Sequence, residues 1–212
     1  MSRRNKERRP ARSNPTKEIK PLILIVCEGK VTEAQYFKEL HRLSRQVLVQ
    51  IDVRGGNGVP RTLVERAKQF RDEQQARAAS EKDDNLRFDQ VWCVFDVDDH
   101  PKILEAVKMA TDDSIKVAVS NPCIELWLLL HFSEPPGNYS RVKVRQLLKK
   151  HILNYEKHID INLLIPGYKQ AVKRAERLAL RKDDVVEWQR NPSSGVFRRT
   201  KVIAGNSPQF PE

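Results

Sequence analysis

Short apolar runs alternate with longer segments of helical spacing in the first part of the chain. Strand-like runs cover 22–27, 48–53, 90–95 and 115–119, and helical spacing covers 32–46, 60–79 and 100–111. Strands that are apolar on both faces and alternate with helices are typical of a mainly parallel sheet that helices cover on both sides. We therefore expect an α/β fold.

The second part of the chain is expected to be mainly helical. From Pro122 onward the spacing predicts helices over 123–132, 140–157 and 166–182. This helical portion, about 122–200, either packs on the sheet or forms a small subdomain. We expect one domain over 21–200, with an arm at 1–20 and a tail at 201–212.

The helix after the first strand carries a start signal. Thr32 and Gln35 have the spacing of a capping box, in which two side chains accept hydrogen bonds from free backbone amides at a helix start. Glu33 lies in the first turn, where the helix dipole favours a negative charge. Gly29 permits a tight exit from the preceding strand.

The formal charge of +11 is unevenly distributed. Residues 1–20 hold eight basic and two acidic residues, so the arm carries about half of the excess. We expect this arm to be disordered, and either to follow a nucleic-acid backbone or to act as a solubilising tail. The helix at about 140–158 carries either a second basic surface of this kind or an ordinary solvated face. The candidate nucleic-acid contacts in the arm are Arg3, Arg4, Arg8 and Arg9.

The cysteines and the hydropathy point to a reducing compartment. Cys27, Cys93 and Cys123 lie singly in or beside apolar segments, without a CxxC pair, so each is expected to be a small core residue. No apolar run approaches the roughly 18 residues that a membrane span needs. We expect a soluble protein in the cytoplasm, with no membrane partner.

Acidic residues follow two of the predicted strands. Glu28 follows the first strand, and Asp96, Asp98 and Asp99 follow the third. The carboxyl ends of parallel strands share one edge of a sheet, so these side chains should meet there and repel one another unless they are protonated or bound to a cation. Oxygen ligands without a cluster of histidine and cysteine favour Mg²⁺ or Mn²⁺.

Other polar residues are candidates for the same edge. Ser120 and Asn121 end the fourth strand, Gly55, Gly56 and Asn57 follow the second, and His100 follows the aspartates. Glu125 falls within an apolar helix, where burial is costly without a partner, so it either joins the carboxylates or pairs with an arginine from the helical half. His131 is expected to be packed and hydrogen-bonded rather than a ligand.

A basic segment near the C-terminus has two possible functions. Asn191 and Pro192 predict a turn, and Ser193 or Ser194 is expected to cap a following helix. Arg198, Arg199 and Lys201 then either contact a phosphate backbone or form a solvated helix face. These three are candidate nucleic-acid contacts.

Four stretches together resemble the RloB/AbiL-type family. They are VCEGKVTEAQYF at 26–37, VFDVDDH at 94–100, VAVSNPCIELWLLLHF at 117–132 and NPSSGV at 191–196. Glu28-Gly29 and Asp96-x-Asp98 also resemble the Toprim arrangement of topoisomerases, primases and OLD-type nucleases, although His100-Pro101 stands where many Toprim proteins have a glycine. The resemblance implies a Toprim-like domain of a bacterial antiphage or abortive-infection system, often found beside an OLD-like ATPase.

The chemistry expected at such a site is metal-assisted cleavage of phosphodiester bonds in DNA or RNA, tRNA included. Asp96 and Asp98 would hold one or two Mg²⁺ ions at the scissile phosphate, with Asp99 as a further ligand. Glu28 would bind metal or act as general acid or base. Glu33, Glu125, Ser120, Asn121 and His100 are candidates for additional or supporting contacts.

Two other functions fit parts of the pattern. VWCVFDVDD matches the first motif of haloacid-dehalogenase phosphatases, in which Asp96 would be the nucleophile. That interpretation leaves Glu28 unused, and Asp183-Asp184 follows a helical stretch instead of the strand that a later motif needs. The second alternative is a non-catalytic protein that binds nucleic acid or a partner through its basic arm.

Overall fold

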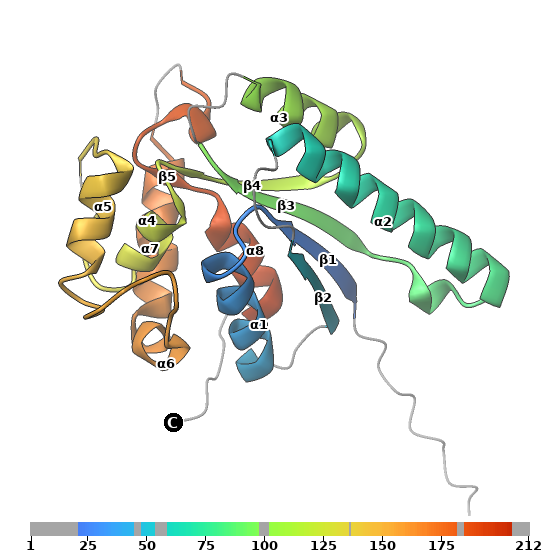
Figure 1. Ribbon diagram of the computed structural model, residues 1–212, viewed down its shortest axis with the longest axis horizontal. Helices are drawn as coiled ribbons and strands as arrows, with labels where there is room; N and C mark the ends of the chain where they lie inside the picture. Colours follow the sequence, from blue (N-terminus) through green and yellow to red (C-terminus); the bar gives the residue numbers. More distant parts are fainter. Residues whose placement is uncertain are drawn as a thin grey trace, which may run out of the picture.

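A central sheet of four parallel strands and one short antiparallel strand organises the molecule (Figure 1). The computed structural model describes residues 21–44, 48–53, 59–97, 102–135, 137–181 and 185–204. The strands are β1 (Leu22–Cys27), β2 (Leu48–Val53), β3 (Gln90–Asp96), β4 (Lys116–Asn121) and β5 (Ser193–Ser194). The four predicted strands and the mainly parallel α/β class are confirmed, with ends that differ by two residues at most.

Helices cover both faces of the sheet. They are α1 (Thr32–Ser44), α2 (Pro60–Glu81), α3 (Ile103–Asp112), α4 (Ile124–Leu129), α5 (Arg141–Leu148), α6 (Ile161–Leu164), α7 (Tyr168–Ala179) and α8 (Val196–Ala204). In Figure 1, α2 and α3 lie on one face of the sheet, α1 and α8 lie on the other, and α4 to α7 gather beside α1 and α8. None of the helices within the described residues is long and apolar enough to cross a bilayer.

The strand order creates a crevice at one edge of the sheet. The order is β2-β1-β3-β4-β5, so the chain moves outward from β1 to β2 through α1 and then crosses back to β3 through α2. Right-handed crossovers require α1 and α2 to lie on opposite faces. The connections that follow β1 and β3 therefore diverge. Ligands of open parallel sheets bind at the carboxyl ends of such a pair of strands.

Alternate residues of the strands build two separate cores. Ile23 and Ile25 of β1 face α1, α4 and α8, whereas Leu24 and Val26 face α2 and α3. This alternation follows from the period of two along a strand. Because both faces are buried, a slip of one residue would exchange the two cores, so the register of the sheet is strongly specified.

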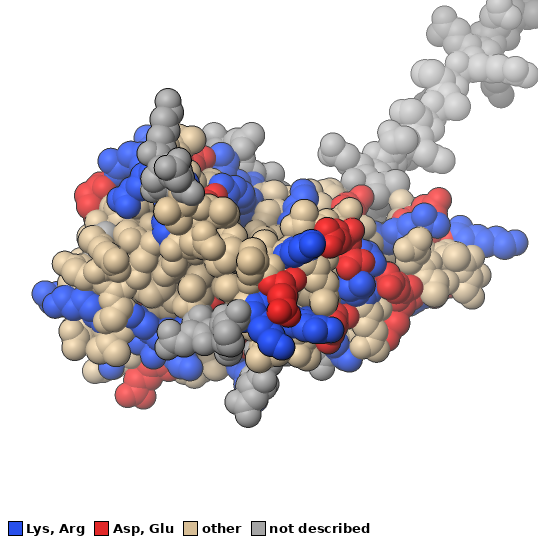
Figure 2. All heavy atoms as spheres, turned by 90° about the horizontal axis from the view of Figure 1, so that it is seen from above, with Lys and Arg blue, Asp and Glu red and all other residues tan. Residues whose placement is uncertain are grey.

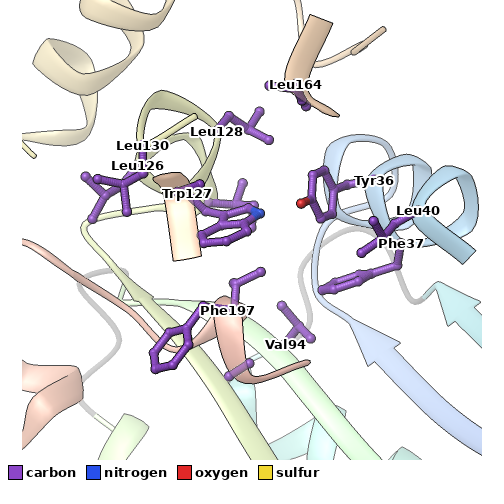
Figure 3. Close-up of a cluster of buried hydrophobic side chains, with 14 of the residues drawn as sticks. Tyr36, Phe37, Leu40, Val94, Leu126, Trp127, Leu128, Leu130, Leu164 and Phe197 are labelled. Atoms are coloured by element: carbon purple, nitrogen blue, oxygen red, sulfur yellow. The ribbon is translucent and has the colours of Figure 1, made fainter. Parts of the chain in front are cut away.

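An aromatic cluster joins α1 to α4 on the first face. Trp127 and Tyr36 point toward each other above Val94 of the sheet (Figure 3), with ring centroids 6.2 Å apart and nearly perpendicular planes. His131 packs against the same rings and its Nδ1 lies 2.9 Å from the carbonyl oxygen of Trp127. This agrees with the expected role of His131 as a packed histidine and fixes α4 beside the sheet.

The predicted helix over 140–157 is wrong in its second half. The helix ends at Leu148, and the chain then follows an irregular path to Asp160. Thr32 donates a hydrogen bond to the carbonyl of Lys157 at 2.7 Å, and the amide of Gln35 bonds both backbone groups of Ile159 at 2.6 and 3.1 Å. The predicted capping box is therefore also wrong, because both side chains hold the segment 149–160 against α1 instead.

The predicted cap by Ser193 or Ser194 is wrong as well. These two serines form β5, which pairs antiparallel with the end of β4, and α8 begins at Val196. The hydroxyls of Ser120 and Ser194 lie 3.1 Å apart. A two-residue strand is too short to leave a periodic pattern in the sequence, which explains why the pattern does not predict this return of the chain to the sheet.

Candidate functional site

A cavity of about 400 Å³ opens at the carboxyl ends of β1 and β3, at the crevice between the diverging connections. Four carboxylates line it: Glu28, Glu33, Asp96 and Glu125. Four basic side chains also line it: Lys30, Arg141, Arg145 and Lys157. The cavity is therefore highly charged with both signs, which distinguishes it from an apolar ligand pocket.

Each carboxylate comes from a different element. Glu28 follows β1, and its backbone amide donates to the carbonyl of Val94 in β3 at 3.0 Å. Asp96 is the last residue of β3, and its side chain is 15% exposed. Glu33 and Glu125 lie in the first turns of α1 and α4 and are buried, at 6% and 1% exposure. The structure thus brings together four of the predicted site residues.

Gly29 allows Glu33 to reach the cavity. The carboxylate of Glu33 occupies the space in which a Cβ atom at position 29 would lie. Any residue larger than glycine would displace that carboxylate, which is the flexible end of a side chain. Glu28 therefore supplies one carboxylate, and Gly29 leaves the space that the carboxylate of Glu33 occupies.

Burial and mutual repulsion favour the protonated forms of two of these groups. Burial raises the pKa of Asp96 well above its usual range, and the nearby Glu33 and Glu125 raise it further. Arg141 opposes this shift, with its guanidinium 3.5 Å from Asp96. Burial is also the main cause of the raised pKa of Glu33. A bound cation would favour the charged forms instead.

Glu125 both faces the carboxylates and pairs with an arginine, so the two expectations for this residue hold together. Its Oε1 accepts a hydrogen bond from Arg145 at 2.7 Å, and the hydroxyl of Tyr155 lies 3.5 Å away. Its Oε2 is buried without a hydrogen-bond partner in the part of the chain that the structure describes. An unpartnered carboxylate oxygen is costly to bury, so it is a candidate ligand atom.

The side chains that line the cavity offer the oxygen ligands that a hard divalent ion prefers. The four side chains offer oxygen atoms, and Glu125 has an oxygen to spare. Within the described residues, however, no three acidic, histidine or cysteine side chains converge on one point as ready ligands. An ion would have to draw the carboxylates together. The predicted Asp98, Asp99 and His100, and also Gly55, Gly56 and Asn57, lie outside the described residues.

Ser120 and Asn121 lie beside the site but do not line the cavity. Ser120 is the register partner of Asp96 on the neighbouring strand, and its hydroxyl faces Ser194. The amide of Asn121 donates to the carbonyls of Trp188 and Gln189 at 3.2 and 3.1 Å. These two residues therefore join β4 to the end of the domain. Their predicted role as additional or supporting contacts of the site stays a prediction.

The predicted nucleic-acid contact at Arg199 is wrong. Its side chain is completely buried, and its guanidinium lies 5.4 Å from the ring of Trp92, where a phosphate backbone does not reach it. Arg198 forms a bidentate ion pair with Glu187, and Lys201 pairs with Glu176 at 2.8 Å. The candidate contacts in the arm, Arg3, Arg4, Arg8 and Arg9, lie outside the described residues.

Charges of both signs are interspersed along α2 on the face in Figure 2. Arg61 pairs with Glu65 and Arg77 with Glu81, each one helical turn apart. Such pairs are typical of a solvated helix face and do not form a uniform basic surface. The basic side chains at the cavity are therefore better placed to contact a phosphate than those of α2.

Sequence reasoning found only part of the basic half of the site. It pairs Glu125 with an arginine of the helical half without naming Arg145, and it does not link Arg141 to the carboxylates. It also places Tyr155 and Lys157 in a helix that is not there. A signal was present. Arg141 and Arg145 are four residues apart, so they share one helix face, and a buried Glu125 requires a cation.

Comparison with known proteins supports one family. The model of the family described as RloB-like protein matches residues 23–203. Searches of curated proteins and of solved structures gave no match. The matched region runs from β1 to α8 and so includes the whole carboxylate site described above. The chain belongs to the RloB-like protein family.

Proposed function

We propose that this chain is a Toprim-type, metal-dependent nuclease. The observation that carries the proposal is the convergence of Glu28, Glu33, Asp96 and Glu125 in one cavity at the sheet edge, with basic side chains around them. Structural ion pairs alone do not account for the arrangement, because Glu125 keeps a buried oxygen without a partner among the described residues. The resemblance of Glu28-Gly29 and Asp96-x-Asp98 to Toprim proteins agrees with it.

Mg²⁺ or Mn²⁺ at such a site would polarise the scissile phosphate and stabilise the charge that develops during in-line displacement. Asp96 and Glu125 are the described residues best placed to hold it, and Asp98 and Asp99 are proposed as further ligands. Arg141, whose guanidinium already lies beside Asp96, would contact the phosphate oxygens. Lys157 lines the same cavity and would add a second positive charge.

Glu28 is the proposed proton-transfer group. It follows β1 directly, and the residue as a whole is less buried than Glu33 and Glu125, although its Oε2 is enclosed. A carboxylate in this position is suited to accept a proton from the attacking water or to bind metal. Glu33, held over Gly29, is proposed to position the other carboxylates by its charge.

The biological setting that we propose follows from the family resemblance. The nuclease would act on DNA or RNA, tRNA included, as the effector of a bacterial antiphage or abortive-infection system. An OLD-like ATPase is the proposed controlling partner. The pairing of Arg141 with Asp96 and of Arg145 with Glu125 is compatible with a site that stays inactive until substrate or partner competes for these cations.

A cleavage assay with matched variants tests the proposal. The purified protein, with and without the ATPase, would be incubated with plasmid DNA and with total RNA in Mg²⁺, Mn²⁺ or EDTA. We expect cleavage in metal only, and a loss of about 100-fold or more in Asp96→Asn and Glu125→Gln. Glu105→Gln is the control, because Glu105 is an exposed carboxylate on α3.

The same assay separates the other functions. A phosphoaspartate trapped at Asp96 would identify the phosphatase chemistry instead. Nucleic-acid binding that persists in EDTA and in Asp96→Asn, with no cleavage under any metal, would identify a non-catalytic binding protein. Cleavage that is equal in wild type, Asp96→Asn and Glu125→Gln would place the active site elsewhere.

A further inference from the structure

A second cavity adjoins the carboxylate cavity. It has a volume of about 310 Å³ and is lined by Glu125, Arg145, Lys149, Tyr155, Glu156 and Lys157. Three of these residues, Glu125, Arg145 and Lys157, also line the first cavity. The ion pair between Glu125 and Arg145 therefore stands at the boundary between the two cavities.

The second cavity differs from the first in charge. Three basic side chains line it, and of its two carboxylates Glu125 is already paired with Arg145. Glu156 is exposed, so solvent screens its charge. Lys149 and Lys157 are also exposed. Each ammonium group has three N–H donors and a positive charge, which suit it to bind a phosphate. The electrostatic preference of this cavity is for an anion.

The backbone around Lys157 is built to hold this arrangement. Lys157 has a φ of 74°, in the left-handed region that L side chains rarely adopt. Thr32 binds its carbonyl, and Gln35 binds both backbone groups of Ile159 two residues later. Non-glycine residues in this region persist where the surrounding structure fixes them, and they concentrate at functional sites.

Two of the four carboxylates lie below the molecular surface. Glu125 is 1% exposed and Glu33 is 6% exposed. A phosphate bound through a metal ion at Glu125 must enter the cavity, and a stiff duplex resists the bending that this requires. A single strand has the freedom to bend, and its next phosphate would then fall beyond the boundary formed by Glu125 and Arg145.

We propose that the second cavity binds the phosphate next to the scissile one, between Lys149 and Lys157, and that the substrate is a single-stranded segment of nucleic acid. This inference rests on the proposed nuclease function, since it takes the first cavity as the site of the scissile phosphate. It adds Lys149 as a residue that positions the strand, and it places Lys157 between the two phosphates. The smallest substrate that uses both cavities then has two linkages.

Binding of short oligonucleotides in Ca²⁺ tests this, because Ca²⁺ offsets the charge of the carboxylates in the first cavity, and electrophoresis after the titration checks that the oligonucleotides remain intact. Calorimetry would compare dinucleotides with one phosphate and trinucleotides with two, in thymidine and uridine series. We expect wild type to bind one of the trinucleotides at least tenfold more tightly than its dinucleotide. The Lys149→Ala/Lys157→Ala double variant should lose most of this ratio. Lys150→Ala should keep it, because Lys150 is also exposed but lines neither cavity.

Two further results complete the test. A longer thymidine or uridine strand should bind at least tenfold more weakly when it is annealed to its complement than when it is single-stranded at equal salt. A wild-type ratio near one, an unchanged ratio in the double variant, or equal binding of duplex and single strand would overturn the proposal. Because the readout is affinity and not cleavage, a protein that binds as expected but never cleaves in Mg²⁺ or Mn²⁺ contradicts the nuclease function alone.

Discussion

The guanidinium of Arg145 lies 2.7 Å from the carboxylate of Glu125, which is almost completely buried in the first turn of α4. Arg145 itself is 38% exposed. This one contact ties the helical half of the chain to the carboxylate cavity, because α4 follows β4 and α5 lies after the intervening loop. It satisfies one oxygen of Glu125 and leaves the other buried without a hydrogen-bond partner among the described residues.

Removal of Arg145 should therefore leave a buried charge uncompensated. We expect Arg145→Ala to lower the free energy of unfolding by about 1–3 kcal/mol, less than the roughly 3–5 kcal/mol of a fully buried pair, because water reaches part of the guanidinium. Adding Glu125→Gln should recover most of this loss. Urea unfolding at neutral pH measures the free energy of unfolding of wild type, the two single variants and the double variant. If the free-energy changes of the single variants add up to that of the double variant, the pairing is contradicted.

His131 should make stability depend on pH. Burial lowers its pKa from 6.5 to about 4, so the folded protein keeps the imidazole neutral where the unfolded chain takes up a proton. Its contribution is fully present above pH 6.5 and is lost as the pH falls toward 4. The raised pKa values of Glu33 and Asp96 act in the opposite direction, so a comparison must isolate the histidine.

The comparison is between wild type and His131→Gln. The difference in free energy of unfolding between them should be largest above pH 6.5 and should shrink steadily between pH 6.5 and 4.5, in urea titrations at fixed ionic strength. A difference that stays constant over this range would show that His131 does not titrate as its burial requires.

The positions of Glu28 and Asp96 can be predicted from the sequence, because the ends of buried strands can be predicted. An apolar run fixes where a buried strand stops, so its position in the chain is enough to place Glu28 and Asp96 at one sheet edge. The basic half depends on tertiary packing. Lys157 reaches the cavity through a segment that Thr32 and Gln35 hold by side-chain contacts to its backbone, and no local pattern predicts such contacts.

Helix phase explains the error at Arg199. Adjacent residues on a helix point about 100° apart, so Arg198 faces Glu187 at the surface while Arg199 faces Trp92 in the core. The prediction treats Arg198, Arg199 and Lys201 as one solvated face, which adjacent residues of a helix do not share. Once Val196 is known to begin the helix, the buried Phe197, Thr200 and Ile203 define its inner face.

Arg199 should reduce the stability of the protein. Its guanidinium has no hydrogen-bond partner among the described residues, and burial lowers its pKa to about 9. We expect Arg199→Met to raise the free energy of unfolding by about 1–3 kcal/mol, because an apolar side chain of similar length avoids the desolvation of a charge and outweighs the contact with Trp92.

The matched variant is Arg198→Ala, which removes a surface ion pair and should change stability by about 1 kcal/mol or less. Both are measured by urea unfolding. Arg199→Met should also leave nucleic-acid affinity unchanged, since the side chain is enclosed. A large loss of stability in Arg199→Met would mean that the guanidinium has a structural partner in solution.

Gly29→Ala tests the geometry of the carboxylate cavity without removing a charge. The added methyl group would occupy the position of the Glu33 carboxylate and displace it, while the backbone stays as it is. If Glu33 helps to place the groups that hold a divalent ion, the Kd for Mn²⁺ should rise by about 10- to 100-fold, the usual effect of losing a residue that orients metal ligands. Gly137→Ala is the control, because nothing lies within 4 Å of the corresponding methyl position. Calorimetric titration with Mn²⁺ measures the affinity, and thermal unfolding without metal checks that both variants fold. Equal Mn²⁺ affinities in wild type, Gly29→Ala and Gly137→Ala would exclude Glu33 from the metal site, because its carboxylate cannot keep its place beside an alanine at position 29.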